Sequence, residues 1–161
     1  MSDELSRRTF LQRAGLGGIA LACTAIALPA DLAALPITYV DGVGGAAERS
    51  YPVPAADSVS IDRAPGVIVV RLQGRAFALR LGCPHQNAAV KWLDKEGRFQ
   101  CSKHDSKYQP DGTYVSGKST RNLDRFAIRQ DGGNLLVDLN RVFQADKDAA
   151  GWAGAIVSLP Q

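Results

Sequence analysis

The sequence predicts an all-β domain, and two features of its central part support this. Residues 57–140 consist of short runs of apolar and β-branched residues separated by glycine-containing turns. Over the same residues, no long stretch repeats its apolar positions with the period of a helix. The length of 161 residues fits one domain, and 45% hydrophobic with 22% charged residues is typical of a soluble globular chain.

The first half of this central part contains the clearest strand pair. Residues 67–72 and 76–81 are rich in β-branched and other apolar side chains, and the Gln73-Gly74 step between them predicts a hairpin. A shorter alternating run at 59–61 precedes this hairpin, and residues 98–100 form another short run after a glycine turn. We therefore expect antiparallel strands that are short and closely spaced.

The second half continues the same pattern. Asp111-Gly112 is a strong turn signal between two aromatic positions. Residues 123–129 and 135–139 are expected to pair around Asp131-Gly132-Gly133. The sequence thus predicts turns and strands as far as about residue 140.

Composition divides the chain into four segments. We expect an export signal or membrane-anchor helix at 1–30, a linker at 31–56, the all-β domain at 57–140 and a C-terminal extension at 141–161. The high density of glycine and proline predicts the linker, although residues 37–40 also fit a short strand. Within the extension, residues 145–155 fit either one short helix or a loose tail packed on the domain.

The first 30 residues have the features of a targeting segment. Arg7 and Arg8 precede an uncharged apolar run from Ala14 to Ala30. Residues 6–12 resemble the twin-arginine export signal, whose pathway carries folded proteins, often with a metal cofactor already inserted. Cleavage after Ala25-Ile26-Ala27 would give a periplasmic protein, whereas retention of the apolar run would anchor the protein at the periplasmic face of the inner membrane.

Side chains that bind metals are scarce and are concentrated in two places. The chain has three cysteines and two histidines, which excludes a disulfide-dense scaffold, an all-cysteine iron–sulfur site and a histidine-rich metal site. Cys83-Pro84-His85 follows one expected strand, and Cys101-Ser102-Lys103-His104 follows another. Each loop therefore supplies one sulfur and one imidazole. Two centres use this set: a tetrahedral zinc site, and a two-iron cluster with both cysteines on one iron and both histidines on the other.

The two ligand loops resemble the cluster-binding loops of Rieske iron–sulfur proteins, and the resemblance covers roughly residues 55–140. It implies a Rieske-type antiparallel β-sandwich with a small subdomain that binds a [2Fe-2S] cluster. By the family pattern, Cys83 and Cys101 bind the inner iron, whereas His85 and His104 bind the outer, solvent-facing iron. Common zinc fingers instead group like ligands, as Cys-x-x-Cys and then His-x-x-x-His. Neutral imidazole ligands raise the reduction potential to about −150 to +300 mV.

Two hydroxyl-bearing residues after His104 bear on this potential. In high-potential members of the family, a serine two residues after the second histidine donates to a bridging sulfide, and a tyrosine four residues after it donates to a cysteine sulfur. Ser106 and Tyr108 stand at these positions. Because hydrogen bonds to sulfur stabilise the reduced, more negative cluster, the resemblance implies a potential in the upper part of the range.

The chain departs from the Rieske subunits of cytochrome bc complexes in three places. Those subunits usually carry a disulfide between the loops, at positions that are Ala88 and Lys103 here, so we expect packing and backbone bonds to hold the loops together. Residues 117–123 replace a proline-rich turn, and the polar Gln86 follows the first histidine. We expect a basic rim around the exposed edge of the cluster, suited to an acidic partner and formed by Lys103, Lys107, Lys118 and Arg121.

These observations imply an electron-transfer subunit of an oxidoreductase rather than a complete enzyme. The resemblance favours a subunit of an exported, membrane-associated respiratory complex of the quinol–cytochrome c reductase kind, with cytochrome partners and His104 as the contact to quinol or partner. The alternatives are a free periplasmic Rieske ferredoxin and the small subunit of an arsenite-oxidase-like molybdenum enzyme. An oxygenase is not expected, because no histidine remains for a second iron site. A net charge of +3 does not favour nucleic-acid binding.

Overall fold

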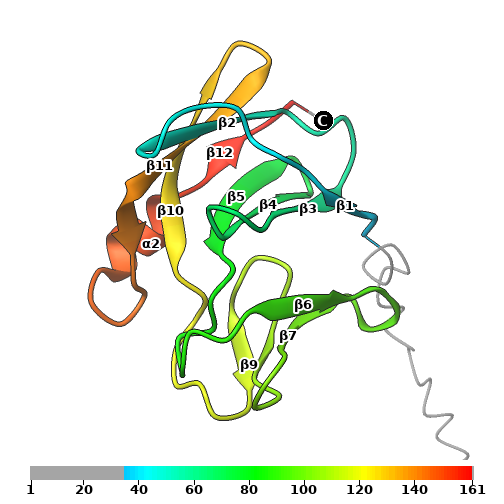
Figure 1. Ribbon diagram of the computed structural model, residues 1–161, viewed down its shortest axis with the longest axis vertical. Helices are drawn as coiled ribbons and strands as arrows, with labels where there is room; N and C mark the ends of the chain where they lie inside the picture. The colour runs from blue at the N-terminus through cyan, green and yellow to red at the C-terminus, as the bar shows by residue number, and fades with distance from the viewer. Residues whose placement is uncertain (1–34, 161) are drawn as a thin grey trace, which may run out of the picture.

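Two β-sheets form the framework of the chain over residues 35–160, the part that the computed structural model describes. The larger, which we call the base sheet, has eight strands in the order β1-β3-β4-β5-β10-β11-β2, with β12 paired to β5. The smaller has the order β6-β7-β8-β9 and lies below the base sheet in Figure 1. The all-β class predicted from the sequence is confirmed. The signal or anchor predicted at 1–30 lies outside the described residues, within which no helix is long and apolar enough to cross a membrane.

The strands are short and most neighbours are antiparallel. The base sheet contains β1 (Ile37–Tyr39), β2 (Glu48–Pro52), β3 (Ser58–Asp62), β4 (Val67–Leu72), β5 (Arg75–Arg80), β10 (Arg125–Asp131), β11 (Asn134–Phe143) and β12 (Val157–Ser158). The smaller sheet contains β6 (Val90–Leu93), β7 (Arg98–Cys101), β8 (Lys107–Tyr108) and β9 (Tyr114–Ser116), with a short 3₁₀ turn η2 (Asp94–Glu96) between β6 and β7. Both hairpins expected from the turn signals, β4–β5 and β10–β11, are confirmed.

The β4–β5 hairpin lies in the middle of the base sheet because its alternate side chains enter two different cores. In β4, Ile68 and Val70 pack into the core shared with the smaller sheet, and Val67 and Val69 pack into the core beneath β10 and β11. In β5, Phe77 faces the first of these cores, while alanines face the second. A strand buried on both faces is apolar at every position, which explains the continuous β-branched run in β4.

The smaller sheet is an insertion between two neighbouring strands of the base sheet. We call residues 81–124, from the end of β5 to the start of β10, the tip subdomain. Leu79 of β5 pairs with Arg125 of β10, and the Arg80 N–H donates to the Asp124 carbonyl at 2.8 Å. The chain therefore leaves and re-enters the base sheet at one place, and a single apolar core spans both sheets.

The segment expected as a linker, residues 31–56, instead contributes two strands from Ile37 onward. β1 pairs with β3 in parallel, and β2 pairs with β11 at the opposite edge of the sheet. The buried Tyr51 of β2 donates to Asp62 at 3.0 Å, and Asp62 also accepts the Gly42 N–H at 2.9 Å. The carboxylate of Asp62 thus holds this segment on the sheet, and its glycines and prolines lie largely in the turns and at the strand ends.

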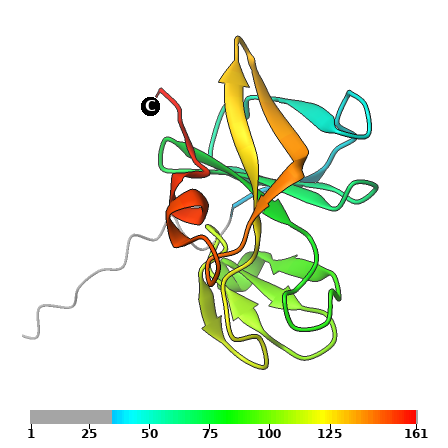
Figure 2. The same cartoon turned by 90° about the vertical axis from the view of Figure 1, so that its left-hand side faces the viewer.

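The C-terminal extension, residues 141–161, is attached to the same sheet as far as it is described. β11 continues to Phe143, and a short helix, α2 (Ala149–Gly154), begins after Asp148, which accepts the Gly151 N–H at 2.8 Å. Figure 2 shows α2 beside β10, at the height where the base sheet meets the tip subdomain. β12 then pairs with β5.

A buried arginine joins α2 to both sheets. Arg125 is 2% exposed, and its guanidinium lies 3.7 Å from the centre of a Trp152 ring and 4.5 Å from that of Phe77. It donates to the Trp152 carbonyl at 3.0 Å and to the Asp111 carbonyl at 2.7 Å. Burial lowers the pKa of Arg125 to about 10, so the side chain stays charged at neutral pH.

Candidate metal centre

The first ligand loop connects β5 to β6 and is closed by its own backbone. The Cys83 N–H donates to the Ala88 carbonyl at 2.8 Å, and the Cys83 carbonyl accepts the Asn87 N–H at 2.8 Å. Asn87 turns the chain with a φ of 55°, in the left-handed region that asparagine tolerates. As a result Cys83 is 1% exposed, whereas His85, two residues later, is half-buried.

The second ligand loop connects β7 to β8 in a similar way. Cys101, the last residue of β7, is 1% exposed, and its N–H donates to the Ser106 carbonyl at 2.8 Å. Asp105 adopts a φ of 54°, and its carboxylate accepts a hydrogen bond from the Gln100 side chain at 2.8 Å. This turn leaves His104 half-buried near the surface, so both loops place sulfur inside and imidazole outside.

Backbone and packing contacts hold the two loops together. The Ser102 N–H of the second loop donates to the Ala89 carbonyl of the first at 3.1 Å. Ala88 packs against the core shared by the two sheets. Within the described residues both cysteines, Cys83 and Cys101, are free thiols.

The four predicted ligands come together as two pairs. The Nδ1 atoms of His85 and His104 are 3.2 Å apart, with their ring planes inclined at 78°. Two imidazole nitrogens bound to one tetrahedral metal at about 2.0–2.1 Å would be about 3.3 Å apart, so this spacing fits both histidines on one metal. The thiol of Cys83 lies beside that of Cys101. Between residues 35 and 160, no three His, Cys, Asp or Glu side chains form a group that could hold a single ion. Two sulfurs paired with two nitrogens are the ligand set of a mixed two-iron cluster.

The electrostatic surroundings favour the metal-binding forms of these ligands. Burial raises the pKa of the Cys101 thiol, but two backbone N–H groups of its own loop and the Cys83 thiol outweigh burial, so the pKa is lowered overall. The pKa of His104 is lowered by loss of solvent and then by neighbouring positive charges, including Lys103. Thiolate and neutral imidazole are the forms that bind metal.

Two buried hydroxyl groups lie next to the ligand loops. The Tyr108 hydroxyl is 3.0 Å from Cys83 Sγ, and Tyr108 is 0% exposed. Burial, and then contact with Cys83, raises the pKa of Tyr108 above its usual value, so the phenol keeps its proton and can donate to the sulfur. Ser106 is also 0% exposed, and its Oγ accepts the Ser119 N–H at 2.9 Å. Because that bond uses a lone pair, the Ser106 proton remains available for a second hydrogen bond.

A third segment, residues 117–123, covers Ser106, and it is the stretch that the resemblance matched to the proline-rich turn of the cytochrome bc subunits. Gly117 has a φ of 109°, and a Cβ at this position would lie 2.5 Å from the Cα of Ser106. Ser119 is buried beside it and anchors the segment through its N–H. A lone glycine before a polar stretch is a signal that could have revealed the close approach, but nothing in the sequence marks Ser119 as buried.

Gly117→Ala is expected to destabilise the protein by about 2 kcal/mol or more, because the new methyl group meets backbone and the φ is strained for alanine. Thermal unfolding followed by circular dichroism measures the loss. Gly133→Ala is the control, since a Cβ there would meet nothing within 4 Å. Equal melting temperatures for the two variants would contradict the tight contact over Ser106.

Comparison with known proteins shows the family to which this chain belongs. The model of the Rieske [2Fe-2S] domain family matches residues 47–127. A cytochrome b6-f complex iron-sulfur subunit of Chlorobaculum tepidum is 29% identical over 73 residues, which are 45% of this chain and 40% of that protein. The match therefore spans less than half of that subunit's length.

Two solved structures are similar to parts of the chain. The cyanobacterial plasma membrane Rieske protein PetC3 from Synechocystis PCC 6803 is 26% identical, with a TM-score of 0.42 over 57% of this chain and 86% of that one. The ferredoxin of carbazole 1,9a-dioxygenase from Nocardioides aromaticivorans IC177 is 18% identical, with a TM-score of 0.38 over 54% of this chain and 88% of that one. Because the family model covers half of the 161 residues, the chain belongs to the Rieske [2Fe-2S] domain family, and its function is electron transfer through a [2Fe-2S] cluster.

Proposed function

We propose that Cys83 and Cys101 bind one iron of the [2Fe-2S] cluster and that His85 and His104 bind the other. The observation that carries this assignment is the 3.2 Å spacing of the two Nδ1 atoms, which suits a shared metal. The cysteines are 1% exposed and the histidines half-buried, so the histidine-bound iron would be the outer one. When bound, the cluster supplies a centre that accepts and releases one electron. The imidazole rings would lie between that centre and whatever docks on the tip subdomain.

Within this assignment, the protein is a high-potential subunit of an exported, membrane-associated respiratory complex that passes electrons from quinol to a c-type cytochrome. Three features support the proposal: the relative named as a cytochrome b6-f complex subunit, the resemblance of residues 6–12 to a twin-arginine signal, and the two hydroxyl groups beside the ligand loops. The half-buried His104 is then the contact for quinol or for the partner protein.

Two measurements on the full chain test this function. Iron and sulfide analysis, together with electron paramagnetic resonance of the reduced protein, is expected to show one [2Fe-2S] cluster with mixed nitrogen and sulfur ligands. A zinc-loaded protein without a resonance would overturn the assignment of the cluster. Cell fractionation is expected to place the chain in the membrane fraction together with a b-type cytochrome. Recovery as a soluble periplasmic protein would instead identify a free ferredoxin or the small subunit of a molybdenum enzyme.

Tyr108→Phe and Ser106→Ala are each expected to lower the midpoint potential. A hydrogen bond worth about 1–2 kcal/mol more to the reduced cluster corresponds to about 40–90 mV for one electron. Protein-film voltammetry measures the shift. Tyr114→Phe is the matched control, because the Tyr114 hydroxyl donates to the Gly117 carbonyl at 2.8 Å rather than to a sulfur. An unchanged potential in both test variants would contradict the proposed role of these hydroxyls.

A further inference from the structure

Free lysine side chains surround the second ligand loop. Lys103 precedes His104 and is exposed, and Lys118 is exposed in the segment that covers Ser106. The backbone on either side of Lys118 is fixed against the loop, since Gly117 approaches the backbone of Ser106 and the Ser119 N–H donates to the Ser106 hydroxyl. Two cations are thereby held beside the half-buried His104 rather than scattered over the surface.

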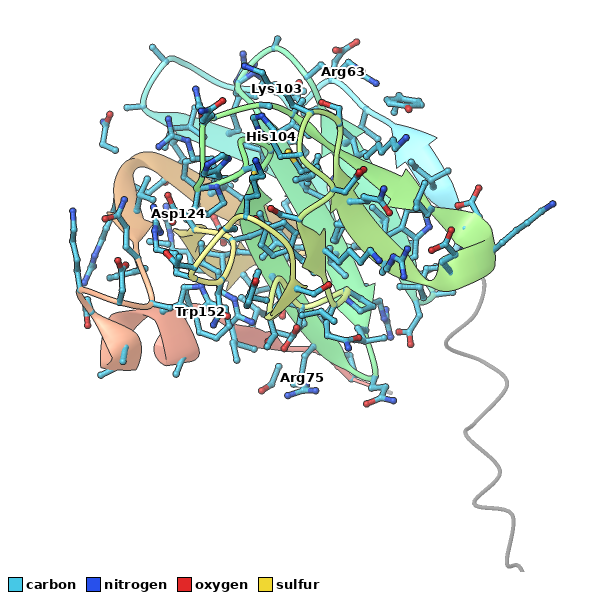
Figure 3. All side chains as sticks on the ribbon, turned by 90° about the horizontal axis from the view of Figure 1, so that it is seen from below. Arg63, Arg75, Lys103, His104, Asp124 and Trp152 are labelled. Carbon is cyan, nitrogen blue, oxygen red and sulfur yellow. The ribbon has the colours of Figure 1, made fainter. Side chains whose placement is uncertain are left out.

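A second pair of cations lies beside the first ligand loop. Arg63, just after β3, and Arg80, at the end of β5, are both exposed. They line one pocket of about 250 Å³ together with Gly82, Asn87 and Ala89 of the loop, and no acidic residue lines it. Figure 3 looks at this end of the molecule and shows Arg63, Lys103 and His104 on the same side of the view, away from Arg75. We call Arg63, Arg80, Lys103 and Lys118 the cationic rim.

Carboxylates also lie near the cationic rim, and the exposed Asp41 lines a pocket with Arg63. Asp105 faces His104 and keeps its negative charge, since the Gln100 side chain that donates to it at 2.8 Å is a neutral amide. Asp124 is 3% exposed and pairs with Arg121, which also lies 3.7 Å from Asp146. Arg121, expected in the sequence at the open basic edge, is therefore neutralised by two carboxylates.

The rim cations are also unpaired within the part of the chain that the structure describes. All six ion pairs found between residues 35 and 160 use other arginines, namely Arg71, Arg98, Arg121, Arg125 and Arg129. Lys103 and Lys118 donate no side-chain hydrogen bond there, whereas Arg63 lies 5.1 Å from the centre of the Tyr39 ring and makes a long contact, at 3.4 Å, with the Tyr39 hydroxyl. Cations without an ion-pair partner that lie beside a redox site attract anionic surfaces and raise association rates.

We propose that the cationic rim is the docking surface for an acidic redox protein, whose carboxylate-rich face covers the histidine end of the tip subdomain. Charge complementarity argues for this occupant, because Lys103 and Lys118 lie near His104, and Arg63 and Arg80 line a pocket with the first ligand loop. The inference rests on the proposed function, since the histidine end is where an electron would leave the protein. The inference adds that the partner's contact surface is negatively charged and that the residues of the cationic rim contact it.

Affinity measurements with two probe proteins test the proposal. The cluster-loaded protein is titrated by calorimetry with an acidic c-type cytochrome and with a basic one, at low and at high ionic strength. The test variants are Lys118→Glu, Arg63→Glu and the double variant. Lys95→Glu is the matched control, because Lys95 is exposed on η2, at the end of the β6–β7 hairpin opposite Cys101. All four variants are first checked for an unchanged resonance of the reduced cluster.

We expect the parent to bind the acidic cytochrome more tightly than the basic one at low salt. The double variant is expected to weaken the acidic complex about tenfold or more, and Lys95→Glu by less than about twofold. The difference should shrink strongly near 0.5 M salt, where the screening length falls below about 5 Å. Tighter binding of the basic cytochrome, or an equal loss in the control and the double variant, would overturn the docking surface. A parent protein without a cluster resonance would instead refute the proposed function.

Discussion

Cys101→Ala is expected to abolish binding of the [2Fe-2S] cluster and to leave the base sheet folded. Cys101 is one of two buried sulfurs at the site, and no other described cysteine stands near enough to replace it. With one thiolate missing, the inner iron would keep a single protein ligand. Iron and sulfide content per chain is therefore expected to fall nearly to zero, together with the visible absorption and the resonance of the reduced protein.

Two comparisons separate loss of the ligand from loss of the fold. Ser102→Ala, one position away on the exposed side of the loop, is expected to keep full iron content. Far-ultraviolet circular dichroism of Cys101→Ala should match that of the metal-free parent, because the strand pairs of the base sheet do not involve this residue. Two irons per chain in Cys101→Ala would refute the proposed ligand set.

Arg125→Ala is expected to produce the largest loss of stability among single arginine substitutions. The change removes two hydrogen bonds and the ring contacts with Trp152 and Phe77, leaving the Asp111 and Trp152 carbonyls without this partner. Leaving two carbonyls without this donor and losing the ring contacts together cost about 3–5 kcal/mol, which lowers the melting temperature by about 10–20 °C in a domain of this size. Differential scanning calorimetry of the metal-free protein measures the change.

Arg129→Ala is the matched control for this prediction, because it changes the same residue type on the same strand. The Arg129 side chain is 59% exposed, and its guanidinium lies 2.6 Å from the Glu48 carboxylate. An exposed pair of this kind contributes at most about 1 kcal/mol. Similar melting temperatures for the two variants would show that the contacts of Arg125 with α2 and the two sheets do not stabilise the fold.

The strand content could be predicted from the sequence because most strands carry a strong local signal. β4 and β5 are nearly continuous apolar runs with a glycine turn between them, and the two cores on either side require such runs. The parallel pairing of β1 with β3 has no local signal, since it joins segments about twenty residues apart. The linker expected at 31–56 was wrong for a related reason. Glycine and proline indicate turns, but they do not show whether the residues between the turns form strands.

That the two Cys-His loops meet could also be predicted, because a chain with so few cysteines and histidines leaves little choice for a shared site. The sequence could not supply the 3.2 Å spacing of the imidazoles, which depends on backbone turns at Asn87 and Asp105. Nor could it separate Arg121, which is paired with carboxylates, from Lys118, which is free. In the sequence, both residues are cationic side chains in polar loops, and only the tertiary contacts distinguish them.

The attachment of the tip subdomain has a consequence for how this protein can vary. Because residues 81–124 leave and return through neighbouring strands, the ligand loops can be lengthened or exchanged without separating any strand pair of the base sheet. Apolar positions of the tip that complete the shared core do not have this freedom. Under the proposed function, exposed residues of the tip subdomain are therefore the ones that can change to suit another redox partner, whereas Cys83, Cys101 and the apolar residues of the shared core have to stay.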